Sequence, residues 1–226
     1  MLQPLTFGVS ARTSDDRDMG DLYRVMIDEG SRAVTAVTVR RGLLETGNLL
    51  KPGGLEKPRD LIVPIAAVVG ADEDEIRITM TAEEFLALPP YVVGDRPEPD
   101  GEWTPPPGYE TEDAVMRLGA GLGGSVYRPP HDEQENRGPN ERHLSHGAAV
   151  WSRDPHKHIG DLDRVLMNDD SNLVAGLVVR RGVIFAHDVV VPAQYIVDLL
   201  DDLVHVDLPA SVRDGLREYR PGQYET

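Results

Sequence analysis

The alternation of apolar and polar residues along this chain predicts short β-strands, and the same series of strands occurs twice. Alternating stretches lead into acidic turns and valine-rich runs, and further alternating stretches follow in each half. A period of two residues is typical of strands that bury one face. The predicted strands occur as matching pairs, one from each half: 7–13 with 147–153, 20–27 with 160–167, 33–40 with 173–180, and 75–80 with 203–208.

These two series are copies of one module. At an offset of 140, residues 20–42 and 160–182 are identical at 11 of 23 positions. The offset falls to 128 where Val63-Pro64 matches Val191-Pro192, so the first copy carries 12 more residues before that point. A repeat of this kind sets the architecture before any single residue is interpreted, and it indicates two similar folding units.

The proline, turn and helix-capping residues of each copy indicate a small all-β fold. Proline after Val63 or Val191 is expected at a strand end, because proline cannot donate a ladder hydrogen bond. Thr81 followed by Glu84 forms a capping-box pattern and predicts a short helix, with a weaker start at Ser211 in the second copy. Short strands with frequent turns favour a small β-barrel, and a sandwich is the alternative. Within 20–27, the alternation is expected to place Tyr23, Val25 and Ile27 on one face of the strand. Leu22, Arg24 and Met26 are then expected on the other face.

We therefore predict two tandem barrels, each with a short C-terminal helix, over residues 1–91 and 143–226. The stretch between them, 92–142, holds 8 of the 18 prolines together with many acidic residues and glycines, and it predicts an irregular linker. The repeat also suggests that the two barrels pack with pseudo-twofold symmetry, which imitates a dimer within one chain. A homo-oligomer remains an open alternative.

Charge and composition narrow the function classes. The formal net charge of −16 disfavours direct contact with nucleic acid or anionic membranes. Without cysteine, the chain has no disulfide, thiol nucleophile or thiolate metal ligand. The apolar run 61–71 is too short to span a bilayer as a helix, and residues 1–16 do not show a signal-peptide pattern, so we expect a cytoplasmic protein.

The residues that end the valine-rich strands resemble those of the PRC-barrel family, named after the cytoplasmic domain of the photosynthetic reaction-centre H subunit. The resemblance implies a small β-barrel that acts as a docking or assembly module. In the second copy it rests on Gly160, Val165, Val178, Val179, Arg180, Arg181, Gly182, Asp188, Val189, Val190, Val191, Pro192 and Ala193, and in the first on Gly20, Val25, Val39, Arg40, Arg41, Gly42, Asp60, Val63 and Pro64.

Two arginine pairs, Arg40-Arg41 and Arg180-Arg181, are the most basic points of the chain. Arginine can clamp a carboxylate or another anion with two parallel hydrogen bonds. The alternative is a strand-end turn whose arginines pair with nearby acids such as Asp188, and we favour it because such surface pairs are common.

Histidines cluster in and after the predicted linker, where five of the seven lie between 131 and 158. Zinc or nickel capture would use His143 with His146, or His156 with His158. These residues lie in a predicted linker and loop, without the fixed frame that a site needs, so we predict no metal site and no cofactor. The sequence also lacks a recognisable catalytic motif, and we expect no enzyme.

The second copy carries the better anchors for a protein partner, since Trp151, Phe185 and Tyr195 are aromatic. The leading functional prediction is a non-enzymatic protein-interaction or assembly module, which would use strand edges or an apolar face. The alternatives are a small-ligand or metal-binding stress protein and, as a third, a ribosome-maturation-like adaptor that binds a basic protein.

Overall fold

The computed structural model describes residues 1–41, 60–92, 137–153, 156–182, 187–213 and 215–222. Met1–Tyr91 and Arg137–Thr226 together form one compact unit. We call these two stretches the first repeat and the second repeat. Their secondary structure is mostly β and forms two separate seven-stranded sheets, which confirms the all-β prediction.

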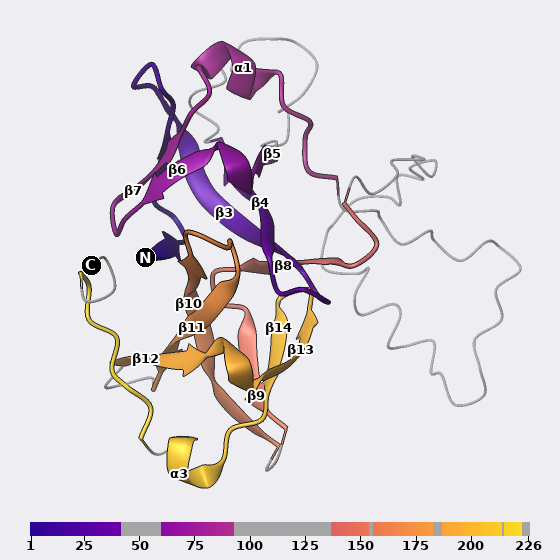
Figure 1. Ribbon diagram of the computed structural model, residues 1–226, viewed down its shortest axis with the longest axis vertical. Coiled ribbons are helices and arrows are strands. Elements are labelled where there is room, and N and C mark those ends of the chain that lie inside the picture. The colour runs from indigo at the N-terminus through magenta and orange to yellow at the C-terminus, as the bar shows by residue number, and fades with distance from the viewer. Residues whose placement is uncertain (42–59, 93–136, 154–155, 183–186, 214, 223–226) are drawn as a thin grey trace, which may run out of the picture. The chain divides into compact units, whose positions relative to one another are not determined.

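The elements of the two repeats follow the same order (Figure 1). The first repeat contains β1 (Leu2–Thr6), β2 (Ser10–Arg12), β3 (Asp18–Asp28), β4 (Val34–Arg40), β5 (Asp60–Pro64), the 3-10 helix η1 (Ile65–Ala67), β6 (Val68–Ala71), β7 (Glu75–Ile78) and α1 (Ala82–Leu86). The second contains β8 (Glu141–Ser145), β9 (Ala149–Ser152), β10 (Lys157–Asn168), β11 (Val174–Arg181), β12 (His187–Pro192), η2 (Ala193–Tyr195), β13 (Ile196–Leu200), β14 (Leu203–Val206) and α3 (Ala210–Arg213).

Most of the expected elements are present. Pro64 and Pro192 end their strands, as proline at a ladder end requires. Thr81 caps α1 with the full capping box, in which its hydroxyl and backbone amide both bond to Glu84. The strands β1 and β8 were not predicted, and β8 begins at Glu141, inside the stretch predicted to be linker.

One predicted face is wrong at β3. A bulge falls between Leu22 and Arg24, and an extra residue in one strand moves the side chains on either side of it onto different faces. Leu22 therefore joins Val25 in the core instead of sharing a face with Arg24. The equivalent bulge in β10 lies between Leu162 and Arg164, so both repeats carry the same irregularity.

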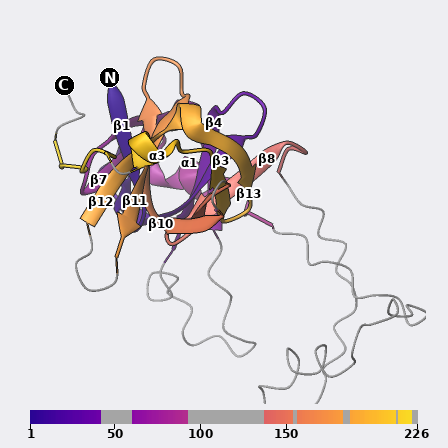
Figure 2. The same ribbon diagram turned by 90° about the horizontal axis from the view of Figure 1, so that it is seen from below.

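The two sheets have the same strand order, but each takes its last strand from the other repeat. The first sheet runs β5-β4-β3-β2-β7-β6 and the second β12-β11-β10-β9-β14-β13. β1 pairs with β10, with Leu5 opposite Val165, and β8 pairs with β3, with Leu144 opposite Val25. Figures 1 and 2 show the indigo β1 beside the orange strands of the second repeat. The repeats are thus joined by reciprocal exchange of their first strands.

The hairpin tips of the two repeats also pair with each other. Ala33 and Leu173, which are equivalent at the offset of 140, form an antiparallel bridge. The amide of Val34 donates to the carbonyl of Asn172 at 2.8 Å, and the amide of Val174 donates to the carbonyl of Arg32 at 2.9 Å. Contact between equivalent positions is what a local twofold relation between two copies produces.

The apolar core is shared. Leu5, Val25, Leu144 and Val165 are completely buried, and all four belong to one hydrophobic cluster that includes side chains of both repeats. The exchanged strands therefore connect the sheets by packing as well as by hydrogen bonds. Within the described residues, the structure contains no helix of the length and apolarity needed to cross a membrane.

The second edge of β8 is held by the carboxylates of the β13–β14 turn. Asp202 accepts hydrogen bonds from the amide and hydroxyl of Ser145 at 2.8 and 2.7 Å, and Asp201 accepts one from the amide of His143 at 3.1 Å. Burial raises the pKa of Asp202, but the contacts with His143 and Ser145 outweigh it and lower that pKa overall. A carboxyl with a depressed pKa in the folded state stabilises above its unfolded pKa, and the stabilisation disappears as pH falls through the folded value.

We expect Asp202→Asn to reduce the free energy of unfolding at pH 7 by about 1 kcal/mol, a value discounted because the carboxylate is partly exposed. The difference from the wild type should shrink below about pH 4, where the wild-type carboxylate also becomes protonated. Urea denaturation at pH 7 and pH 3 measures both values. Asp207→Asn, at an exposed position near β14, is the matched control. An equal loss at both pH values would contradict the role of the charge.

Candidate interaction surfaces

The first arginine of each strand-end pair is engaged in ion pairs. Arg40 donates to Asp60 from Nε at 2.8 Å and from Nη2 at 3.0 Å. Arg180 contacts Asp163 at 2.9 Å and Asp188 at 3.2 Å. The pairing with Asp188 is the arrangement favoured from the sequence. Arg41 and Arg181 are half-buried beside them.

These ion pairs belong to two equivalent junctions between the repeats. In one, Arg24 pairs with Asp60 and lies 5.0 Å from the ring of Tyr91, whose hydroxyl bonds to Nδ1 of His143 at 2.9 Å. In the other, Arg164 lies 4.7 Å from the ring of Tyr219. There, both Arg164 and Tyr219 bond to Glu73. Burial, followed by the contact with Glu73, raises the pKa of Tyr219.

Because each junction bonds a tyrosine of one repeat to a side chain of the other, it fastens the two repeats together. The Arg24 and Arg164 positions are equivalent at the offset of 140, and the Tyr91 and Tyr219 positions at 128. Residues that serve the same contact in both repeats support the fold. We therefore look for function at exposed positions where the repeats differ.

The four candidate histidines do not converge. His143 is buried and lies 3.2 Å from Asp201, whereas His146 is exposed and lies 3.8 Å from Asp163. His156 and His158 lie against the ring of Trp151 instead. Among the residues that the structure describes, no three histidine or acidic side chains are grouped to hold a metal ion.

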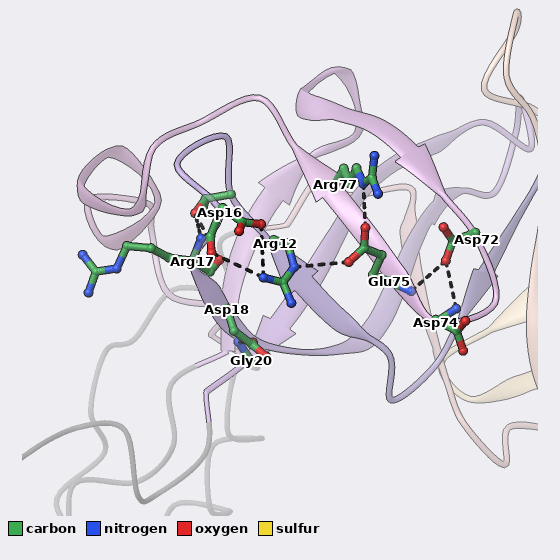
Figure 3. Close-up of polar contacts among 10 residues, drawn as sticks. Arg12, Asp16, Arg17, Asp18, Gly20, Asp72, Asp74, Glu75 and Arg77 are labelled. Carbon is green, nitrogen blue, oxygen red and sulfur yellow. Dashed lines mark hydrogen bonds and ion pairs between the residues drawn. The ribbon is translucent and has the colours of Figure 1, made fainter.

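A groove with a pair of arginines lies on the first repeat, over the parallel pair β2 and β7. Arg12 on β2 is the register partner of Arg77 on β7. Figure 3 shows both side chains turned to Glu75, which accepts from Nε of Arg12 at 3.2 Å and from Nε of Arg77 at 2.6 Å. We call this the β2–β7 groove; it has a volume of about 700 Å³ and is lined by Arg12, Thr13, Ser14, Asp16, Val69, Glu75, Arg77, Ile78 and Thr79.

A second hollow of about 440 Å³ adjoins this groove and shares Val69 and Arg77 with it. Val69 lies at a bulge in the edge strand β6 and is 60% exposed. Gln3, from the exchanged strand β1, also lines the second hollow. The exchange of first strands thus extends the concave surface from one sheet towards the other.

The equivalent face of the second repeat carries different chemistry. On β9 and β14, Trp151 and His205 are register partners at the positions of Arg12 and Arg77. The half-buried Trp151 stacks on His156 with ring centroids 4.8 Å apart, and its ring lies 5.2 Å from that of His158. We call these four side chains the Trp151 face. An aromatic, histidine-rich surface on one repeat therefore corresponds to an arginine–glutamate groove on the other.

The two other aromatic candidates differ in position. Tyr195 is half-buried on η2 and packs against the hydrophobic core, so most of its ring serves folding. Phe185 lies outside the described residues. Trp151 is the predicted anchor that the structure places on an outward face.

Sequence reasoning missed Arg12, Glu75 and Arg77. The alternation of residues 75–78 could have placed Glu75 and Arg77 on the outer face, because Ile76 and Ile78 are the apolar members. Arg12 joins them through a parallel pairing across more than sixty positions of sequence, and no local pattern encodes that pairing.

In the comparisons with known proteins, no protein-family model and no curated protein matches this sequence. The likeness to the PRC-barrel family accordingly rests on the repeat residues quoted above.

Proposed function

We propose that this chain is a non-enzymatic assembly module, built from two PRC-barrel-like repeats, that binds a protein partner through the Trp151 face. The observation that carries the proposal is the contrast between the repeats. Their junction residues correspond, as with Arg24 and Arg164, whereas the exposed faces over β2–β7 and β9–β14 have different side chains. A repeat that serves only the fold does not require different exposed side chains. A module that recognises its partner through one of the two repeats does require them.

The chemistry of the Trp151 face suits a protein partner. Tryptophan is the residue most often found as an energetic anchor in interfaces, because it buries a large ring and still offers an N–H group. Stacking on His156 fixes the orientation of the ring before a partner arrives, which reduces the entropy lost on binding. The net charge of −16 steers the chain towards partners with a basic surface.

We expect Trp151→Ala to weaken partner binding at least tenfold while leaving the fold intact. The tagged full-length chain would be used to purify partners from its native host at moderate salt, and each stoichiometric partner would then be purified and titrated by calorimetry. Leu86→Ala, which removes an apolar side chain that is 49% exposed on α1, is the matched control.

Equal affinity of the wild type and Trp151→Ala for the recovered partner would reject the Trp151 face as the binding surface. Recovery of no stoichiometric partner would count against the assembly role. Recovery of a second copy of this chain would mean that the partner is the protein itself.

A further inference from the structure

The β2–β7 groove contains an arrangement of charges that the fold does not require. Arg12 and Arg77 lie directly opposite each other on adjacent strands, where like charges repel. Glu75 offsets this repulsion by accepting one hydrogen bond from each guanidinium group. The second repeat has the same pairing of strands with Trp151, Leu203 and His205 at these positions, so the sheet forms without the charges.

The geometry leaves the outer ends of both guanidinium groups available. Glu75 occupies only the Nε atoms. Within the described part of the chain, the two terminal nitrogens of Arg77 donate to no protein acceptor, and the same is true of Nη2 of Arg12. Nη1 of Arg12, in contrast, contacts Asp16. Arg77 has a side chain that is 67% exposed and is one of the residues that line the groove.

Asp16 shows which group suits the remaining donors. Its carboxylate lies 3.2 Å from Nη1 of Arg12, and its side chain is 85% exposed. An exposed ion pair of this kind contributes little to stability, so another carboxylate can displace it at small cost. Asp16 therefore acts as an internal competitor at the site.

From these contacts we infer that the β2–β7 groove binds the carboxylate groups of a ligand, which the terminal nitrogens of Arg77 and Nη2 of Arg12 receive on either side of Glu75. The planar guanidinium group matches a planar carboxylate with two parallel hydrogen bonds. A phosphate dianion fits less well, because it concentrates two negative charges at one point beside the carboxylates of Glu75 and Asp16. The exposed hydroxyl group of Ser14, which also lines the groove, can provide a further polar contact for the rest of the ligand. This site is independent of the Trp151 face.

The test is a nuclear magnetic resonance titration of the full-length chain labelled with ¹⁵N, following the arginine Nε–H and backbone amide signals. One arm uses glutarate, a free dicarboxylate, and another uses the peptide acetyl-Ala-Ala-Glu-Ala-Ala-amide with its glutamine counterpart as control. Sodium chloride and inorganic phosphate at matched ionic strength report non-specific ion effects. We expect saturable shifts of Arg12 and Arg77 with glutarate, with the glutamate peptide, or with both.

Substitutions of the proposed binding residues test the direction in which the affinity should change. Arg77→Gln and Arg12→Gln should each weaken binding at least fivefold, and Asp16→Asn should strengthen it about twofold or more, because the competing charge is removed. Arg220→Gln, at a side chain that is 75% exposed in the second repeat, should leave the affinity unchanged. Binding of glutarate alone would assign a free small acid, and binding of the peptide alone would assign a protein carboxylate.

The inference is overturned if neither probe gives saturable shifts, or if chloride or phosphate produces the same shifts. It is also overturned if both arginine variants bind as the wild type does, or if Asp16→Asn weakens binding. None of these results bears on the Trp151 face, which is tested by a different substitution with a different partner.

Discussion

Gly20→Ala is expected to lower the free energy of unfolding by about 3 kcal/mol or more, since it combines a steric clash with backbone strain. A Cβ atom at this position would lie 2.2 Å from the carbonyl oxygen of Arg40 and 2.9 Å from its carbonyl carbon. Both are backbone atoms of β4, so the clash is relieved only if the ladder between β3 and β4 opens. The φ angle of +114° adds to the penalty, because side chains other than that of glycine rarely adopt it.

Urea denaturation followed by far-ultraviolet circular dichroism measures the loss. Gly160→Ala should behave in the same way, since its Cβ would lie 2.2 Å from the carbonyl oxygen of Arg180. Gly70→Ala is the matched control: it lies in a strand, its added Cβ would meet no atom within 4 Å, and we expect a change below about 1 kcal/mol. A loss of less than 1 kcal/mol for Gly20→Ala would contradict the close approach of β3 to β4.

Gly20 also illustrates what the repeat in the sequence could reveal. It is identical in both copies, and a residue kept at equivalent positions of a duplicated module indicates a structural requirement, here the close approach to β4. The long strands were predictable for a related reason. The valine-rich runs of β4 and β11 are apolar stretches bounded by turns, and that local pattern is enough to define them.

What the sequence could not show is the origin of the strands at the sheet margins. β1 and β8 have little local signal, because LQPLT and ERHLS do not alternate regularly and one contains a proline. Their partners lie in the other repeat, and the pairing is stabilised by a shared core that no window of sequence samples. The same limit applies to the β2–β7 groove, where Arg12 and Arg77 come together through long-range pairing. Trp151 was identifiable because an aromatic residue in an otherwise aromatic-poor chain stands out by composition alone.

The exchange of first strands leads to a second prediction, in which one substitution has a large effect on stability. Leu5→Ala removes a completely buried side chain from β1, and such a change typically costs about 3 kcal/mol. Because β1 pairs with β10, the local consequence should appear in β10 of the second repeat, as well as in β1 itself, more than in the other strands of the first repeat. Hydrogen exchange followed by mass spectrometry under native conditions locates that consequence. We expect faster exchange in peptides that cover residues 164–168 of β10.

Leu144→Ala is the reciprocal experiment. It removes the equivalent buried side chain from β8, whose partner is β3, so exchange should accelerate over residues 24–28 of the first repeat. Leu86→Ala, at an exposed position of α1, should leave both regions protected. If each leucine variant instead loosened only the strands of its own repeat, the exchange of β1 and β8 would be wrong. The crossed pattern would show that neither sheet is complete without the other repeat, because each sheet borrows a strand and part of its core. Two domains that each fold around their own first strand would not produce that pattern.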